Sequence, residues 1–409
     1  MRRVVVTGLG IVSSIGTGAE EVTASLRHAK SGVVSAPDHI KYGFRSQVWA
    51  PPSLGVTGED WAPLVDRRAA RFLANGTAWG HIAFEEALKD SGMTAEEIRD
   101  DRIGLIVGEG GPSTQIILQA AQTTIEKGAP KRIGPFAVPK AMASGPSAVL
   151  STWFQMRGIN YSISSACATS VHCIGAGAEQ IQWGKQDVVF AGGCEDIDWS
   201  MSNMFDAMGA MSSDFNDTPS VASRAYDAAR DGFVIAGGAG IVVLEEYERA
   251  KARGAKIYGE VVGYGANGDG YDMVAPSGEG AQRCMKIAMA EAGGRKIDYL
   301  NPHGTSTPVG DSKEMDAIRA VFGADMPMIS STKSLTGHSL GAAGAQEAIY
   351  SLLMLQHGFA SESAHIENLD PQFEGMPILR QRWNGELTTV MSNSFGFGGT
   401  NGTVIFSKV

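Results

Sequence analysis

Two stretches of this sequence say most about how the chain folds. They are SACATSVHCIGAGAEQIQWG at 165–184 and TGHSLGAAGAQEAIYSLLMLQHG at 336–358. Both are rich in small residues and have helical character, and each opens with a reactive side chain, Cys167 or His338. One such segment in each part of the chain indicates a strand–helix unit that occurs twice. Their identity is weak, so these residues alone leave a duplication open.

Short apolar runs rich in β-branched residues predict strands outside these two segments. They lie at 4–7, 103–107, 188–191, 241–244, 387–392 and 403–406. Alanine-rich stretches between them, such as 69–91 and 144–157, have helical character. Apolar strands that alternate with helices are typical of a sheet covered on both faces. The sequence therefore predicts an α/β fold, and no proline-rich linker or run of charge separates domains.

The overall composition argues against several classes of protein. Glycine accounts for 52 of the 409 residues, well above the usual level of about 7%, which predicts tight turns and helices packed backbone to backbone. The formal charge of −10 argues against nucleic-acid binding. No apolar run is long enough for a membrane span.

The cysteines and the first residues of the chain indicate the cellular compartment of the protein. The four cysteines are too few for a disulfide framework and include no C-x-x-C pair, so neither a disulfide scaffold nor a metal site is predicted. The start MRRVVVTGLGIVSS is like a signal peptide, but Gly8 and Gly10 interrupt its apolar run, and a buried first strand is the better interpretation. We expect a cytoplasmic protein.

Three residues in glycine- and hydroxyl-rich turns suit thioester chemistry. Cys167 lies before a helix, where free N–H groups stabilise a thiolate or a developing oxyanion. His303 lies in YLNPHGTSTPVGD and His338 in SSTKSLTGHSLGAAG, which also holds Lys333. Taken singly, each of these residues has a simpler interpretation. Cys167 could be a small buried residue, each histidine a hydrogen-bonded loop residue, and Lys333 a solvated lysine. Together they allow the sulfur to attack an acyl group while imidazoles exchange protons with a carbonyl oxygen.

The glycine-rich segment MSNSFGFGGTNG at 391–402 does not fit a nucleotide loop. After Gly396 and Gly398 the dinucleotide fingerprint needs a third small residue, but Asn401 stands there and no helix follows. These glycines instead suit close approach of the backbone to an active site. There the N–H of Phe397 could face an oxyanion.

These motifs together resemble those of the β-ketoacyl-acyl carrier protein synthases, the condensing enzymes of fatty-acid synthesis. The resemblance rests on SSACATS, HGTSTPVGD, STKSLTGHSLGAAGAQE and SNSFGFGGTN, in this order and over essentially the whole chain. MFDAMGAMS and RAYDAARDGFVIAGG are more similar to bacterial synthase I than to synthase II. The family has the thiolase fold, with five layers (αβαβα), two duplicated halves and a homodimeric assembly. We expect the halves at 1–250, with the cysteine, and 251–409, with the histidines.

The resemblance also implies an activity and the roles of single residues. Cys167 would accept an acyl chain from acyl carrier protein, and His303 and His338 would assist decarboxylation of the malonyl thioester. By the same resemblance the product would be two carbons longer, cis-unsaturated chains would be elongated too, and no cofactor would be needed. Lys333 would be the lysine of the catalytic site, and the Cys167 and Phe397 N–H groups the oxyanion hole, with Phe397 also gating the pocket. The implied substrate-binding residues are Thr305, Thr307, Phe205, Met142 and Phe395.

Pro302, where serine or threonine is common in this family, is a departure that leaves the imidazole of His303 in place. Acyl carrier protein is acidic, so an acidic enzyme needs local basic patches to bind it. Two groups of basic residues are candidates: Arg67, Arg68 and Arg71, and Lys127, Lys131 and Arg132. A solvated face is the simpler interpretation from the sequence; the resemblance implies carrier docking.

Three related alternatives fit less well. A thiolase would carry a second catalytic cysteine near its C-terminus, but Cys284 is the last cysteine and lies outside any glycine-rich loop. A coenzyme A-primed initiating synthase would have asparagine where His338 stands. A non-catalytic partner subunit that sets chain length would lack the nucleophile, which Cys167 supplies.

Overall fold

The computed structural model describes residues 1–409, and five strands of its N-terminal half lie side by side in one sheet. These strands are β1 (Val4–Ser13), β5 (Ile103–Gly108), β6 (Asn160–Tyr161), β7 (Val188–Glu195) and β8 (Gly238–Glu246). They lie in the order β6-β5-β7-β8-β1. β5 is parallel to β6 and β7, and β8 is antiparallel to β7 and β1.

The C-terminal half repeats this sheet. Its strands are β9 (Gly259–Gly268), β10 (Tyr299–Asn301), β11 (Met328–Ile329), β14 (Thr389–Gly396) and β15 (Thr400–Ser407). Their order, β11-β10-β14-β15-β9, again places the third, second, fourth, fifth and first strands of the half side by side, with the same directions. The duplicated halves are confirmed. The two sheets join through a short β1–β9 pairing, and β2 (Gly16–Thr17) pairs with β1.

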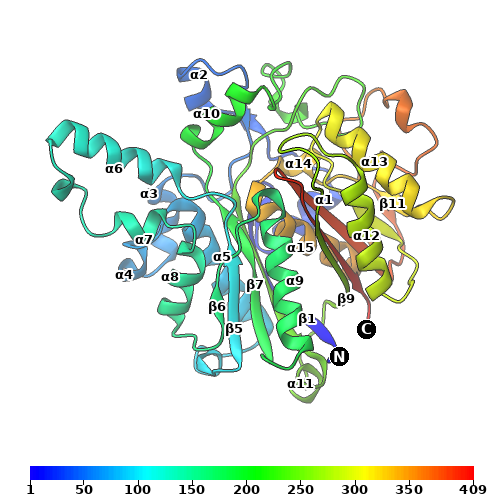
Figure 1. Cartoon of the computed structure of the whole chain (residues 1–409), viewed down its shortest axis with the longest axis horizontal. Coiled ribbons are helices and arrows are strands. Elements are labelled where there is room, and N and C mark those ends of the chain that lie inside the picture. The colour runs from blue at the N-terminus through cyan, green and yellow to red at the C-terminus, as the bar shows by residue number, and fades with distance from the viewer.

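Helices complete the five layers (Figure 1). α9 (Thr169–Gln182) and α15 (Ala343–His357) pack against each other and against both sheets in the middle layer. α5 (Asn75–Ser91) and α8 (Gly145–Phe154) cover the outer face of the first sheet, and α12 (Glu279–Glu291) and α13 (Pro308–Phe322) form the outer layer of the second. α15 is buried from Ala343 to Leu355 within the largest hydrophobic core. The αβαβα arrangement expected from the resemblance is confirmed.

Glycines allow the outer helices to lie directly on the first strand of each half. A Cβ on Gly10 of β1 would come within 1.8 Å of the Ala83 carbonyl oxygen of α5. In the second half, a Cβ on Gly265 of β9 would come within 2.2 Å of the Cys284 carbonyl oxygen of α12. Equivalent strands thus use glycine for the same contact, which confirms the close backbone packing predicted from composition.

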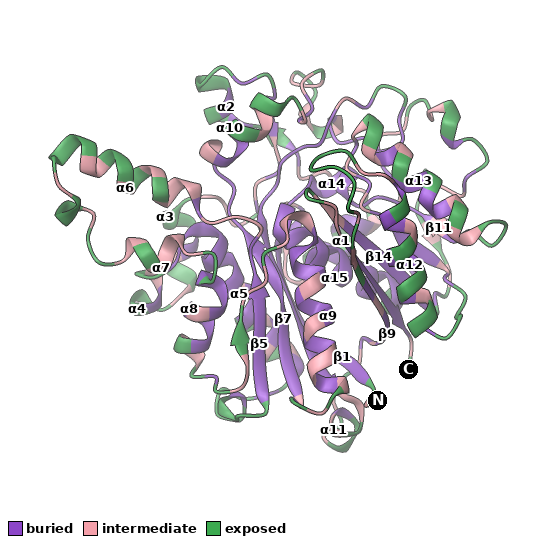
Figure 2. Ribbon diagram, in the orientation of Figure 1, coloured by how far each residue is buried: buried purple, intermediate pink, exposed green.

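Shorter elements occupy the connections. They are α1 (Ala19–Arg27), α2 (Pro37–Lys41), α3 (Gly58–Trp61), α4 (Arg67–Ala70), α6 (Thr114–Lys127), α7 (Ala137–Ala141), α10 (Trp199–Met208), α11 (Tyr247–Ala252), α14 (Lys333–Thr336), β3 (Val34–Ser35), β4 (Val48–Trp49), β12 (Phe359–Ala360) and β13 (Trp383–Asn384). α6 projects from the body and has no buried residue (Figure 2). None of the helices has the length and apolarity required to cross a membrane.

Candidate active site

Cys167 and His338 lie at matching turns of the two halves. Cys167 is the middle residue of a 3-10 turn, Ala166–Ala168, immediately before α9, and His338 precedes the turn Leu340–Ala342 before α15. Ala166 has a φ of 49° and Leu340 a φ of 48°. Residues other than glycine rarely adopt this left-handed backbone conformation. Such residues cost about 1–3 kcal/mol each and persist where the surroundings hold them. The duplicated fold thus delivers both reactive groups to the same place.

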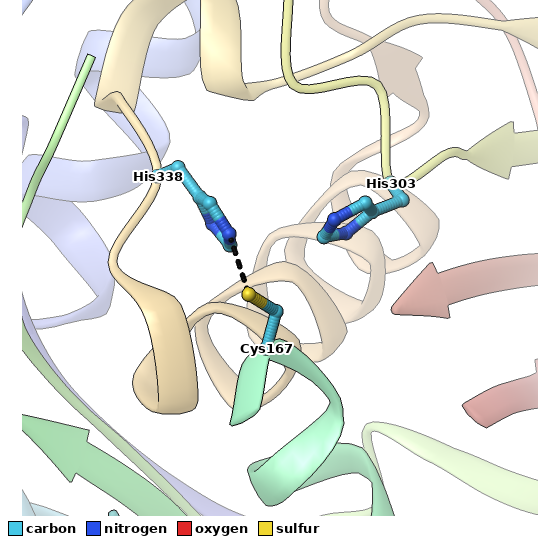
Figure 3. A group of neighbouring side chains, drawn as sticks. All are labelled: Cys167, His303 and His338. Carbon is cyan, nitrogen blue, oxygen red and sulfur yellow. Dashed lines mark hydrogen bonds between the residues drawn. The ribbon is translucent and has the colours of Figure 1, made fainter. Parts of the chain in front are cut away.

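The cysteine and the two histidines face one another (Figure 3). His338 Nε2 lies 3.0 Å from the Sγ of Cys167. His303 follows β10, and its ring centroid lies 5.1 Å from that of His338, with the two planes nearly perpendicular at 88°. The structure therefore brings together the three residues that the sequence singled out for thioester chemistry.

Burial keeps this group uncharged at rest. Burial raises the pKa of the Cys167 thiol to about 12, although the nearby charge of Lys333 lowers it in part. The pKa values of His303 and His338 lie well below the usual value because of burial and the same lysine charge. Burial thus opposes the thiolate that the free N–H groups at the helix start would stabilise. For the sulfur to attack from this state, its proton would have to move to a base, and His338 Nε2 lies within hydrogen-bond distance.

Lys333 is buried behind the histidines. It begins α14, is 1% exposed, and its Nζ donates to Glu347 of α15. The interpretation as a solvated loop lysine is therefore wrong. Cysteine and histidine donors within 4.8 Å of one another are a ligand set that zinc takes, but the Lys333 ammonium beside both imidazoles opposes a divalent cation there.

Glu314 of α13 anchors the His303 loop. Its two oxygens accept the backbone N–H groups of His303 and Gly304, each at 2.8 Å, and Asn393 Nδ2 donates to it at 3.2 Å. Pro302 leaves this bonding intact because the donor is the N–H of His303. Glu314 is not among the site residues predicted from the sequence. Its signal is an acidic residue eleven positions after the histidine, in the first turns of the following helix.

The three residues open into a cavity of about 360 Å³. The predicted substrate-binding residues Thr305, Thr307, Phe205 and Phe395 line it, as does Phe397. Met142, which follows α7, and Lys333 do not. The end of β14 reaches the cysteine, since a Cβ on Gly396 would lie 3.1 Å from the Cys167 nitrogen. Phe397 is 38% exposed at this position.

The two basic groups lie outside the cavity. Arg67 and Arg68 are exposed on α4, and Arg71 follows them on the surface. Lys127 ends α6, and Lys131 and Arg132 lie exposed on a short turn after it. The rings of Phe72 and Phe136 meet edge to face at 5.2 Å, so the segments that follow the two groups touch.

Comparison with known proteins gives one family throughout. The model of the β-ketoacyl synthase N-terminal domain matches residues 1–250, and that of the C-terminal domain matches residues 258–367. The chain is 57% identical to 3-oxoacyl-[acyl-carrier-protein] synthase 1 of Escherichia coli K12, over 100% of both chains. It is 56% identical to that of Haemophilus influenzae, over 100% of this chain and 99% of the relative. Identity to the synthase 2 of Vibrio cholerae is 40%, over 100% and 99%.

Solved structures agree. A β-ketoacyl synthase from Burkholderia phymatum superposes with a TM-score of 0.93 at 35% identity, over 100% of both chains. A ketosynthase solved in complex with its acyl carrier protein, AntDE:AntF, superposes with a TM-score of 0.90 at 28% identity, over 100% of this chain and 99% of that one. With these matches over its full length and its cysteine and two histidines in one cavity, the chain belongs to the β-ketoacyl synthase family.

Proposed function

We propose that the protein condenses an acyl chain with malonyl-acyl carrier protein and so elongates fatty acids by two carbons, as a synthase of type 1. The observation that carries this proposal is the 3.0 Å contact of His338 Nε2 with Cys167 Sγ, with His303 beside it in the same cavity. The higher identity to type 1 than to type 2 relatives supports the subtype. No cofactor is required beyond the phosphopantetheine arm of the carrier.

Acyl transfer comes first. His338 takes the proton of Cys167 as the sulfur attacks the thioester carbonyl of acyl-acyl carrier protein. The tetrahedral oxyanion collapses, the carbon–sulfur bond to the carrier breaks, and the carrier thiol leaves with a proton. The N–H groups of Cys167 and Phe397 would stabilise the oxyanion, which the close approach of Gly396, the residue before Phe397, to the Cys167 turn supports.

Condensation follows on the acylated enzyme. Malonyl-acyl carrier protein loses CO₂, and the electron pair of the broken bond forms an enolate whose oxygen His303 and His338 stabilise by donating hydrogen bonds. The enolate carbon attacks the carbonyl carbon of the Cys167 thioester, the carbon–sulfur bond breaks, and the released thiolate takes up a proton from solvent. Burial, assisted by the charge of Lys333, keeps both imidazoles neutral. Thr305 and Thr307 bind the pantetheine arm on the cavity wall.

The direct test supplies purified protein with acyl- and malonyl-acyl carrier protein and measures 3-oxoacyl product and CO₂. Acyl carriers of graded length, saturated and cis-unsaturated, define the preference that Phe205 and Phe395 impose on the chain. Acceptance of both saturated and cis-unsaturated carriers would support the proposal. Use of an acyl-coenzyme A primer alone would instead indicate an initiating synthase.

We propose that Arg67, Arg68 and Arg71 dock the acidic carrier, together with Lys127, Lys131 and Arg132. The Arg67→Glu/Arg71→Glu variant is expected to raise KM for acyl-acyl carrier protein about tenfold at low salt, with little change in kcat, because complementary charge accelerates encounter. The effect should shrink as salt rises. Lys251→Glu/Lys286→Glu makes the same charge change on α11 and α12 and serves as control. An equal KM for both variants would contradict the docking site.

We propose that the enzyme is a homodimer. Ile125 of the projecting helix α6 is 81% exposed, and Val138 of α7 is 73% exposed. In addition, β6 leaves an exposed edge on the first sheet. Apolar exposure and an open strand edge are typical of surfaces that pair. Sedimentation should give twice the 43.0 kDa of one chain. Ile125→Asp/Val138→Asp should give the single mass, while Ile287→Asp on α12 should not; a wild-type monomer would contradict the dimer.

We further propose a division of the chain into halves at 1–250 and 251–409, which the repeated strand order and the two family models support. We also propose a cytoplasmic location. The four free cysteines support it, because reduced thiols persist in that compartment.

A further inference from the structure

Glu195 is a buried acid that the proposed chemistry does not use. It ends β7 in the N-terminal half, and its side chain is 0% exposed. One carboxyl oxygen, Oε2, accepts the backbone N–H groups of Gly110 and Gly341, both at 2.8 Å, and Oε1 accepts that of Gly111 at 3.2 Å. A single side chain therefore joins a loop of the first half to a turn of the second.

Gly341 is the structural counterpart of Cys167. Each is the middle residue of a 3-10 turn whose first residue is left-handed and whose end leads directly into a central helix. In the first turn the N–H of Cys167 finds no acceptor beyond its own sulfur. In the second turn the equivalent N–H of Gly341 is occupied by the Glu195 carboxyl. The fold thus builds the same turn twice, and in one copy the N–H at its centre is taken by a side chain of the protein itself.

The filled turn adjoins His338. The backbone of His338 is held on one side, where its N–H donates to Val234 and its carbonyl accepts from Ala236. Three residues later, Glu195 holds Gly341. The contact is tight, since a Cβ on Gly341 would lie 2.3 Å from the Gly110 nitrogen, and Gly110 in turn adjoins the carbonyl oxygen of Ala166. The turn that presents His338 and the turn that presents Cys167 therefore meet at this junction.

We propose that Glu195 is a positioning residue of the condensation. By occupying the second turn, its carboxyl group sets the distance between His338 and Cys167. The inference rests on the proposed function only for its turnover readout, because His338 also governs how readily the Cys167 thiol reacts with any electrophile.

The test measures alkylation of Cys167 by iodoacetamide at pH 7, followed by turnover. At this pH the comparison reports lost hydrogen bonds more than lost charge, since burial raises the pKa of Glu195 to about 8. Glu195→Ala should slow alkylation about tenfold, since the general base is displaced. It should lower kcat per acylatable site about 100-fold, the cost of a small misplacement, with KM within about threefold. Glu195→Gln keeps a carbonyl oxygen for Gly110 and Gly341 and should stay within about threefold of wild type.

Glu109→Gln is the matched control, because Glu109 is also buried beside Gly110 but makes no hydrogen bond to Gly341. Expressing kcat per Cys167 that carries an acyl label excludes unfolded protein from the comparison. If Glu195→Ala does not fold, Glu195→Asp takes its place, because its side chain is one methylene too short to span the junction. The proposal is overturned if the alanine or aspartate variant alkylates Cys167 at the wild-type rate. It is equally overturned if glutamine is as damaging as alanine. Slow alkylation in the alanine or aspartate variant would support the role of Glu195 even if the wild-type protein showed no condensing activity. Absence of that activity would count against the proposed function alone.

Discussion

Replacing Cys167 with alanine is expected to abolish condensation, lowering turnover by about 10⁴-fold or more, as is usual when a covalent nucleophile is removed. Acylation forms a bond to Sγ, and alanine has no atom that can carry the chain. Product formation and the acyl label retained on the protein measure the two consequences together. The fold should be preserved, because Cys167 is only partly buried and lies in the wall of an existing cavity.

No other thiol can take over this role. Cys173, Cys194 and Cys284 are fully buried and line no part of the cavity. Cys173→Ala is therefore the matched control: it removes a cysteine of α9, six residues along, and should leave the acyl label in place. Condensation by the Cys167→Ala variant, or an acyl label on another residue, would show that the proposed mechanism is wrong.

The sequence predicted the fold best where strands are apolar throughout. The runs at 103–107 and 188–191 lie within β5 and β7, whose residues are all buried between helices. β9 was missed because four of the ten residues in GEVVGYGANG are glycine. Those glycines weaken the strand pattern, yet Gly265 is where α12 lies on the sheet. The feature that hides β9 from pattern analysis is therefore a requirement of packing.

The weak identity between the two small-residue helices left the duplication open, although the structure repeats the turn before each of them. What the two copies share is backbone: a left-handed residue, a short 3-10 turn and a buried helix. Leucine and alanine occupy the two left-handed positions. Because neither residue type signals that conformation, only the coordinates show the equivalence.

For the site, motifs identified the candidate reactive groups but not the residues that hold them. Cys167, His303 and His338 stand in recognisable turns. Glu195 comes from a distant strand, and Glu314 and Glu347 stand in the helices that follow the two histidine turns, where they look like ordinary acidic residues. Their importance comes from burial against specific N–H groups or against Lys333. The raised pKa of Cys167 was also beyond the sequence, because it follows from burial in the folded chain.

Replacing each of the two histidines with asparagine is expected to affect acylation and decarboxylation differently. His338 Nε2 contacts Sγ at 3.0 Å, and no hydrogen bond joins His303 to the sulfur. His338→Asn removes the proton acceptor and should slow acylation of Cys167 about 100-fold, the usual range for a general base. It should also slow malonyl decarboxylation by about 10²–10³-fold, as loss of one oxyanion donor does. His303→Asn should slow decarboxylation to a similar extent but leave acylation nearly unchanged.

Rapid-quench measurement of acyl label on Cys167, and of CO₂ released from malonyl-acyl carrier protein, follows the two steps separately. Each variant controls for the other, because both replace an imidazole that lines the cavity by the same amide. The backbone anchors are independent of the rings: Glu314 holds the N–H of His303, and Val234 holds that of His338. Equal losses of acylation in the two variants would mean that the contact between His338 and the sulfur does not carry the proton. Undiminished CO₂ release in either variant would remove that histidine from the enolate site.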